Sequence, residues 1–339
     1  MAAEPAYQHD QPALRLDGFL HKDGKPDTSG YLSVDSSHEI YFELSGRVDG
    51  VPVVILHGGP GTGISPIAHR FFDPSFFRLI RFDQRGSGRS RPAGSLAANT
   101  TEHLIADMET LRTHLEISSW VVFGGSWGAT LALAYGIAYP ARCLGFLLRS
   151  VALGRASEFR WWARGMRQIF PESWHRFAGH VGAGEDDDLL EAYASRLQSE
   201  DDEISTPAAV EWHRYAASCG TLFPSNARKL DTALPAELVN MARIEAHYFR
   251  NNAFLADNWI LDNRSRIAHL PASIVHGRYD IISPVVNSYE LARTWPSANL
   301  RIVDGAGHLL TEYALAETLF EEAERIKAWF LSPACMGHV

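Results

Sequence analysis

One pentapeptide constrains the fold of this chain more than any other feature: Gly124-Gly125-Ser126-Trp127-Gly128, a G-x-S-x-G sequence. It follows a short apolar run and precedes a helix-forming run over residues 129–139. A serine between a strand and a helix stands on a tight turn. Glycines let the backbone segments approach there, and the helix N-terminus offers N–H groups to negative charge. The pattern predicts that Ser126 is a nucleophile, and a glycine-rich turn that merely contains a serine is the alternative.

Length and charge narrow the class of protein. The 339 residues have room for one large α/β domain with an insertion. The 31 basic and 40 acidic residues give a net charge of −9, without a Lys/Arg block, so we expect no nucleic-acid or membrane partner. The acidic first thirty residues do not resemble a signal peptide. The most apolar stretch, residues 131–153, is interrupted by Pro140, Arg142 and Arg149, so we expect a helix and a buried strand there instead of a membrane span. Three scattered cysteines favour a reducing compartment, and we predict a cytoplasmic protein.

The hydrophobic pattern predicts a sheet that alternates with helices. Residues 30–34 and 39–44 alternate apolar and polar side chains, as an antiparallel hairpin does, whereas residues 52–56 are apolar throughout, as in a central parallel strand. Further strands are predicted at residues 77–83, 144–148, 273–277 and 299–303, and a helix at 312–330. Asn99 with Glu102 predicts the capped start of another helix. These elements give an α/β fold with a mostly parallel sheet.

Residues 152–264 differ from the flanking sequence, because aromatic residues are scattered there through amphipathic helical segments without a convincing strand. We predict a helical cap in which most of these aromatic residues form the cap's own core. The predicted domains are an N-terminal arm (1–29), an α/β core (30–151 and 265–331), the cap (152–264) and a tail (332–339).

A second glycine-rich segment, residues 57–63, follows the strand predicted at residues 52–56. An ordinary turn is the alternative, but three glycines within the first five residues after a central strand favour a loop whose backbone N–H groups face a site.

A serine nucleophile needs a base, and the base needs an acid that orients it. His308 follows the last predicted strand in the loop Gly305-Ala306-Gly307-His308, and Asp280 follows the preceding strand. Asp304 competes with Asp280 for the role of the acid, but its nearness to His308 makes a reach to the far imidazole nitrogen awkward. His, Asp and Glu are not grouped at metal-ligand spacings, so we expect neither a metal nor another cofactor.

The chain resembles the prolyl aminopeptidases, or proline iminopeptidases, among the α/β-hydrolases. The resemblance covers about residues 30–330 and rests on these segments: His57-Gly-Gly-Pro-Gly61, Phe82-Asp-Gln-Arg-Gly-Ser-Gly-Arg-Ser90, Asn99-Thr-Thr-Glu-His-Leu104, Gly124-Gly-Ser-Trp-Gly128, Ile169-Phe-Pro-Glu-Ser-Trp174, Ala242-Arg-Ile-Glu-Ala-His-Tyr-Phe249 and Gly277-Arg-Tyr-Asp280. It implies an α/β-hydrolase fold with a helical cap inserted before the last two strands. It also implies that Ser126 is the nucleophile, Asp280 the acid and His308 the base, with oxyanion N–H groups from Gly59 and Trp127.

The resemblance further implies that glutamates of the cap bind the substrate's free α-ammonium group. One of them is present as Glu245. The other should follow the second aromatic residue of a Trp-x-x-Trp-Glu segment, but the matching run here is Trp212-His-Arg-Tyr215-Ala216, so Ala216 replaces a carboxylate. Glu211 would point about 140° away from Ala216 on a helix. We expect Glu245, Ala216, Trp212 and Tyr215 to form the substrate-binding wall.

Three hypotheses of function follow. The first is a serine hydrolase that releases N-terminal proline, or a related residue, from a small peptide. The second keeps the same catalytic residues but acts on a small-molecule amide or ester without a free amino terminus, as Ala216 suggests. The third is a non-catalytic binding protein on a hydrolase scaffold.

Overall fold

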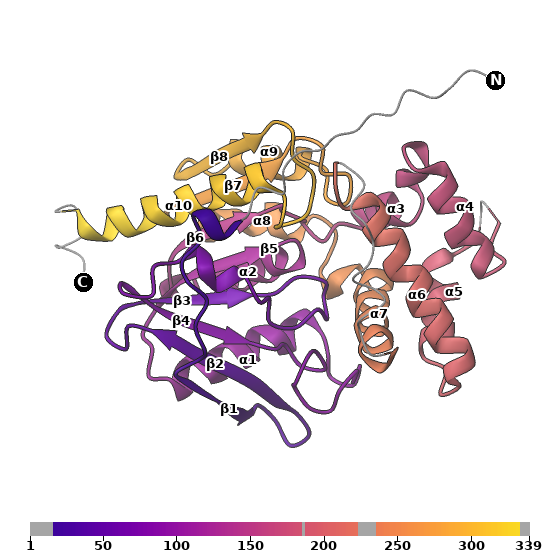
Figure 1. The fold of residues 1–339 in the computed structure, drawn as a ribbon, viewed down its shortest axis with the longest axis horizontal. Coiled ribbons are helices and arrows are strands. Elements are labelled where there is room, and N and C mark those ends of the chain that lie inside the picture. The colour runs from indigo at the N-terminus through magenta and orange to yellow at the C-terminus, as the bar shows by residue number, and fades with distance from the viewer. Residues whose placement is uncertain (1–15, 185–186, 223–234, 333–339) are drawn as a thin grey trace.

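A computed structural model describes residues 16–184, 187–222 and 235–332. The described residues form one eight-stranded sheet of order β1-β2-β4-β3-β5-β6-β7-β8 (Figure 1). β1 and β2 form the predicted antiparallel hairpin and β2 runs antiparallel to β4, while the strands from β4 to β8 are parallel. The strands are β1 Thr28–Ser33, β2 Glu39–Gly46, β3 Val51–Leu56, β4 Phe77–Phe82, β5 Trp120–Gly125, β6 Cys143–Arg149, β7 Ala272–Gly277 and β8 Ala298–Val303.

Helices cover both faces of the sheet, which explains why the central strands are apolar throughout. One face packs against α1 (Thr101–His114), α2 (Trp127–Ala138), α8 (Trp259–Asn263) and α9 (Val286–Arg293). The other face packs against α10 (Tyr313–Leu331) and two short 3₁₀ helices, η1 (Leu16–Gly18) and η2 (Ala68–Phe71).

The parallel register decides where the loops meet. β3 lies beside β5 with Leu56 opposite Gly124, and β6 and β7 follow beyond β5. Because parallel strands end at the same edge of a sheet, the loops after β3, β5, β7 and β8 gather at one edge.

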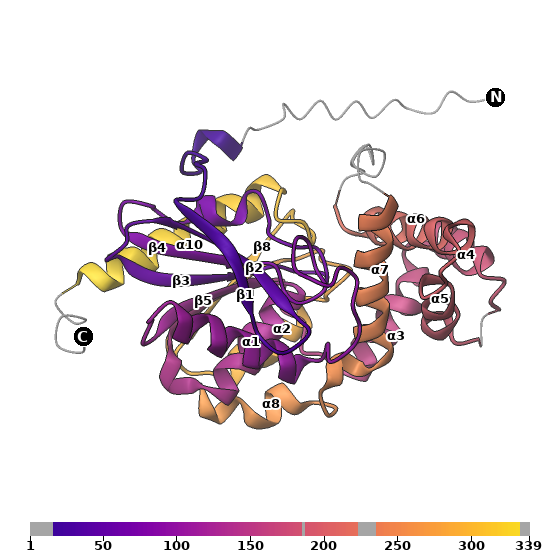
Figure 2. The ribbon, with the colours of Figure 1, turned by 90° about the horizontal axis from the view of Figure 1, so that it is seen from below.

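The segment between β6 and β7 contains helices and no strand among its described residues. Its first five α-helices lie at one end of the molecule, where α7 stands between the sheet and the others (Figures 1 and 2). These helices are α3 Ala156–Ala163, α4 Pro171–His180, α5 Leu189–Leu197, α6 Asp202–Cys219 and α7 Pro235–Arg250. The other 3₁₀ helices among the described residues are η3 Pro140–Arg142, η4 Gly165–Gln168, η6 Asn252–Phe254 and η7 Arg264–Arg266.

Aromatic residues form the core of this helical unit, as predicted. Trp162, Trp174, Trp212 and Tyr215 are buried together, and the ring centroids of Trp162 and Trp212 lie 4.5 Å apart. The last part of the predicted cap segment does not belong to this core. Its residues Tyr248 and Ile260 pack instead into the core on the α2 side of the sheet.

Two local predictions need correction. Thr100, not Asn99, is the N-cap of α1, and its side chain accepts from the backbone N–H of His103; the Asn99 side chain instead donates to the carbonyls of Arg85 and Ser95. The described part of the predicted arm is also partly folded, because Leu20 is buried beside α10 and β1 already begins at Thr28. The tail predicted from residue 332 lies almost wholly outside the described residues.

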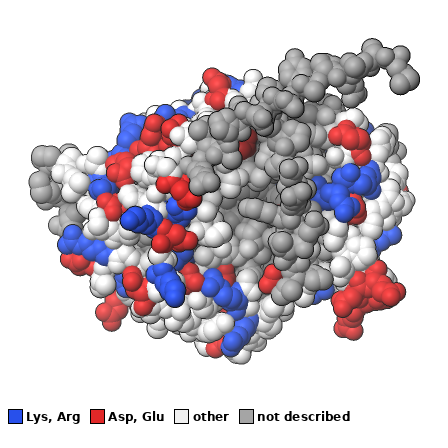
Figure 3. Space-filling model, in the orientation of Figure 1, with Lys and Arg blue, Asp and Glu red and all other residues white. Residues whose placement is uncertain are grey.

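Basic and acidic side chains are interspersed on the described surface that Figure 3 shows, and Lys and Arg form no continuous stripe there. Within the described ranges, none of the helices combines the length and the apolar character that crossing a membrane would require.

Candidate active site

The turn that carries Ser126 is strained and tightly packed. Ser126 has φ 56° and ψ −126°, which is unusual for a residue with a Cβ atom. A Cβ atom on Gly124 would lie 2.1 Å from the carbonyl oxygen of Gly128, and one on Gly128 would lie 2.5 Å from that of Leu56. Both flanking glycines are therefore needed for the turn, which presents the Ser126 hydroxyl at the N-terminus of α2.

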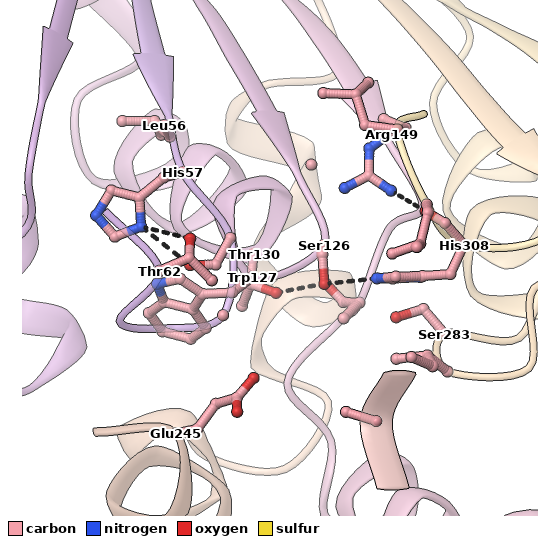
Figure 4. A pocket seen from close by; sticks show the side chains of 18 of the residues that line it. Leu56, His57, Thr62, Ser126, Trp127, Thr130, Arg149, Glu245, Ser283 and His308 are labelled. Atoms are coloured by element: carbon pink, nitrogen blue, oxygen red, sulfur yellow. Dashed lines mark hydrogen bonds between the residues drawn. The ribbon is translucent and has the colours of Figure 1, made fainter. Parts of the chain in front are cut away.

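His308 and Asp280 reach Ser126 from the loops after β8 and β7. The Nε2 atom of His308 lies 3.1 Å from Ser126 Oγ (Figure 4), and its Nδ1 atom lies 2.9 and 2.8 Å from the two carboxylate oxygens of Asp280. The competing residue Asp304 is exposed and pairs with Arg278. The structure thus brings Ser126, His308 and Asp280 together in one hydrogen-bonded line.

Asp280 is held in its charged form. Burial by itself raises the pKa of a carboxyl group, but the charge and hydrogen bonds of His308 and His276 outweigh burial and keep the pKa of Asp280 well below its usual value. The backbone N–H of Ser283 also donates to Asp280, over 2.8 Å. A charged Asp280 fixes the tautomer of His308, so that Nδ1 carries the proton and Nε2 can accept one from Ser126.

The loop after β3 lies against the serine. A Cβ atom on Gly58 would come within 3.3 Å of the Gly125 carbonyl oxygen and 3.6 Å of Ser126 Cβ, and Gly59 lines the same cavity as Ser126 and Trp127. Gly59 has φ 106°, which favours glycine. The predicted donors, Gly59 and Trp127, therefore belong to two segments that flank Ser126.

Gln84 ties these two segments together. Its backbone N–H donates to His57 Nε2 and its side-chain amide donates to the His57 carbonyl, both over 3.0 Å. Its side-chain oxygen accepts from the indole N–H of Trp127 over 2.8 Å. Gln84 was not singled out from the sequence, because its partners lie 27 and 43 residues away and no local pattern reveals them.

Ser126 opens onto a cavity of about 450 Å³ between the sheet edge and the cap helices. The core side of the cavity carries Ser126, His308 and the loop after β3, and the cap side is formed by residues of α3, α6 and α7. The residues from these three helices are Glu158, Phe159, Trp162, His213, Ala216, Ala217, Met241, Glu245 and Phe249.

Glu245 faces Ser126 from across the cavity (Figure 4). Its carboxylate accepts a 2.6 Å hydrogen bond from the indole N–H of Trp212, and no described Lys, Arg or His forms an ion pair with it. The side chain is accessible from the cavity, but the surrounding protein shields it from bulk solvent. Burial raises the pKa of Glu245 to about 7, although the Trp212 bond opposes the shift. The carboxyl group is therefore available to a ligand.

Comparison with known proteins places this site in a family. The family described as alpha/beta hydrolase fold matches residues 51–314. A proline iminopeptidase of Neisseria gonorrhoeae is 43% identical over 305 residues, which cover 89% of this chain and 97% of that protein. A probable proline iminopeptidase of Leptolyngbya boryana is 42% identical over 311 residues, covering 89% of this chain and 95% of the relative. This chain is a member of the proline iminopeptidase family.

Solved structures agree with the fold. A proline iminopeptidase-related protein from Thermus thermophilus aligns with a TM-score of 0.57 at 25% identity, over 91% of this chain and 99% of the other. The proline iminopeptidase of Mycobacterium smegmatis aligns with a TM-score of 0.58 at 16% identity, over 89% of this chain and 98% of the other, a likeness of fold alone.

The position at which this family member departs from the expected pattern lies on the cavity wall. Ala216 and Ala217 line the cavity together with His213, since residues three and four apart share one face of a helix. Glu211 pairs instead with Arg214 and Arg176. The α6 face that looks into the cavity therefore carries two methyl groups and a buried imidazole, whose pKa burial lowers.

Two of the predicted substrate-binding residues do not line the cavity. Trp212 and Tyr215 are fully buried in the core of the cap helices and are not among the residues that line the cavity. Tyr215 donates to the Trp162 carbonyl, and Trp212 acts on the cavity only through Glu245. The predicted substrate-binding wall therefore lacks both side chains, because they pack into the core of the cap helices behind it.

A second acid on the cavity wall, Glu158, was not apparent from the sequence either. Unlike Glu245, it is fully engaged: Arg155 pairs with it over 2.8 Å, and the Leu153 N–H and the Asn287 side chain donate to it. Its role is to anchor the start of α3. Within the described ranges, His, Cys, Asp and Glu form no group of three or more that could hold a metal ion.

Proposed function

We propose that this protein is a prolyl aminopeptidase-type serine hydrolase that releases proline, or a related residue, from the free amino terminus of a small peptide. One observation carries the proposal: the hydrogen-bonded line of Ser126, His308 and Asp280 opens onto a cavity whose far wall offers the carboxyl group of Glu245, which forms no ion pair with a described residue. The names of the relatives point to the same activity.

In this proposal Ser126 attacks the carbonyl carbon of the amino-terminal residue. His308 Nε2 takes the serine proton and passes it to the leaving amine, while Asp280 stabilises the imidazolium that forms. The N–H groups of Gly59 and Trp127 stabilise the oxyanion of the tetrahedral intermediate, and the N-terminus of α2 adds to that field. Water, activated by His308, then hydrolyses the acyl-enzyme.

In this proposal Glu245 is the residue that selects substrates with a free amino terminus. A substrate ammonium group beside its carboxylate would make a charge-assisted hydrogen bond that is shielded from bulk water, a contact worth roughly 1.5–3 kcal/mol. The cavity closes around the amino-terminal residue with apolar side chains such as Phe159, Trp162 and Phe249. Such a wall suits the ring of proline.

Ala216 supports a second candidate function, the hydrolysis of a neutral amide or ester. Its methyl group stands where the family resemblance places a carboxylate, so the cavity has one free acid instead of two. A substrate whose amino group is acylated would lose little binding free energy in this cavity, and the space beside Ala216 and Ala217 could accept the acyl group.

A prolyl arylamide and its N-acetyl form distinguish these functions. We expect the wild-type protein to cleave the free amine with the higher kcat/KM, and Ala216→Glu to raise that value by about tenfold through a second charged contact. Preferential cleavage of the N-acetyl form by the wild-type protein would favour the second candidate. A fluorophosphonate that fails to label Ser126 would favour the third hypothesis, a non-catalytic protein.

The remaining expectations concern the protein's surroundings. We place it in the cytoplasm, because the two described cysteines, Cys143 and Cys219, are buried thiols without disulfides. Its partners would be small peptides or small-molecule amides, without a nucleic acid or a membrane.

A further inference from the structure

Glu312 stands at the N-cap of α10 but does not cap that helix. Glutamate is not a favoured N-cap residue. Its carboxylate turns instead to the loop that carries His308, where the N–H of Gly307 donates to both oxygens over 3.0 Å and the N–H of Leu309 donates to one over 3.1 Å. The two residues that flank His308 are thus held by one side chain.

The same carboxylate also binds the chain that leaves α6. The N–H of Leu222, three residues after the end of α6, donates to Glu312 Oε2 over 3.3 Å. The segments pack closely, because a Cβ atom on Gly307 would lie 3.0 Å from Glu312 Oε1 and 3.1 Å from the Leu222 nitrogen. Glu312 therefore joins the loop of His308 to the exit of α6.

The backbone of His308 itself is fixed on both sides. Its N–H donates to the carbonyl of Gly220, which directly follows α6, over 3.1 Å. Its carbonyl accepts from the guanidinium of Arg149, whose pKa burial lowers to about 10, so that it is still charged at neutral pH. The imidazole can meet both Ser126 and Asp280 only if this backbone stays in place.

We propose that Glu312 is a positioning residue for His308, and that it makes the placement of the base depend on the end of cap helix α6. The proposal rests on the role proposed above for His308. Without the carboxylate, three backbone N–H groups lose their acceptor at once, and the loop can move His308 away from Ser126. Misplacement of a reacting group by about 1 Å can cost on the order of 100-fold in rate.

The rate of labelling of Ser126 by a small fluorophosphonate tests this proposal, because it depends on activation of the serine by His308 and not on the choice of peptide substrate. We expect Glu312→Ala to label about 100-fold more slowly than wild type, and kcat for a prolyl arylamide to fall by a similar factor while KM stays within about threefold. Glu317→Ala is the matched control, since Glu317 lies on the same helix, is exposed and pairs with Tyr313; it should label at the wild-type rate.

Glu312→Gln separates positioning from folding. It keeps an oxygen that can accept from Gly307 and Leu309, so we expect most of the labelling rate to return. Hydrogen exchange should become faster in Glu312→Ala at residues 219–222 and at residues 305–312 together, but not in the control. The proposal is overturned if a folded Glu312→Ala labels at the wild-type rate, if Glu312→Gln labels no faster than Glu312→Ala, or if the loss only tracks the unfolded fraction. If wild type labels but leaves prolyl arylamides intact, the substrate proposal alone fails.

Discussion

The two sides of the cavity are built differently. On the core side, Asp280 and Gln84 are each hydrogen-bonded to several partners: Asp280 binds His308 and Ser283, and Gln84 joins the loop after β3 to Trp127. On the cap side, the described residues give Glu245 one neutral donor, Trp212, and the neighbouring face of α6 presents Ala216 and Ala217.

This difference suggests separate tasks for the two sides, the catalytic reaction on one and the choice of substrate on the other. Paired groups on rigid loops keep a fixed geometry, which acyl transfer requires. An unpaired carboxyl group in an apolar wall is costly to the folded protein unless a ligand uses it. In the proposed function, the core side therefore carries out the reaction, and the cap side selects the substrate. Variants on the two sides should fail in different ways.

The largest effect is expected at Ser126. Ser126→Ala removes the nucleophile on the core side, and kcat should fall by about 10⁶-fold for free and N-acetylated substrates alike. Steady-state kinetics with both arylamides measures this, and an unchanged thermal unfolding curve shows that the turn persists. Residual turnover above about 1% of wild type would contradict the assignment of Ser126.

Asp280→Asn should come next. An amide in place of the carboxylate no longer holds the Nδ1–H tautomer of His308, and kcat should fall by about 10⁴-fold for both substrates, as it does in other serine hydrolases. Asp304→Asn is the control, because Asp304 is exposed and pairs with Arg278 at the surface. Equal losses in the two variants would count against Asp280 as the orienting acid.

The effect of Glu245→Gln should depend on the substrate. The free amine should lose about 10- to 150-fold in kcat/KM, whereas the N-acetyl form should change little. Because burial raises the pKa of Glu245 to about 7, the carboxylate forms only as pH rises through that value. The wild-type preference for the free amine should therefore grow between about pH 6 and 8, and a preference that is independent of pH would exclude Glu245 as the ammonium site.

The same pKa shift has a consequence for stability. Between the usual value of 4.5 and about 7, the folded protein binds more protons at Glu245 than the unfolded chain does, so this group destabilises the fold as pH rises. The full shift corresponds to about 3 kcal/mol. Glu245→Gln should thus gain in Tm relative to wild type as the pH rises from about 5 to about 8.

Trp212→Phe should have the smallest effect. It removes the indole N–H that lowers the pKa of Glu245, so that pKa should rise further above about 7. At about pH 7 the kcat/KM for the free amine should fall a few-fold, and its pH profile should move to higher pH, while the N-acetyl form is unaffected. Equal loss for both substrates would instead point to damage in the packing of the cap helices.

The sequence alone determined the fold and the core side of the site. Continuous apolar runs such as Val51–Leu56 require cover on both faces, so they predicted central parallel strands. The glycines around Ser126 predicted the turn because only that backbone brings β5 so close to α2. Chain order then pointed to His308 and Asp280, since loops that follow parallel strands end at one edge of the sheet.

Only the tertiary structure decided which side chains share the cavity. Trp212 and Ala216 lie four residues apart on α6, yet the Trp212 side chain packs against Trp162 and binds Glu245, whereas Ala216 lines the cavity. Gln84 acts through partners that the fold brings near from elsewhere in the chain, and Glu312 joins its own loop to Leu222, 90 residues away. Helical periodicity predicts which residues share a face of a helix, but not which other residues that face packs against. In this protein the packing of the cap helices against one another and against the sheet decides where the acids of the cap lie.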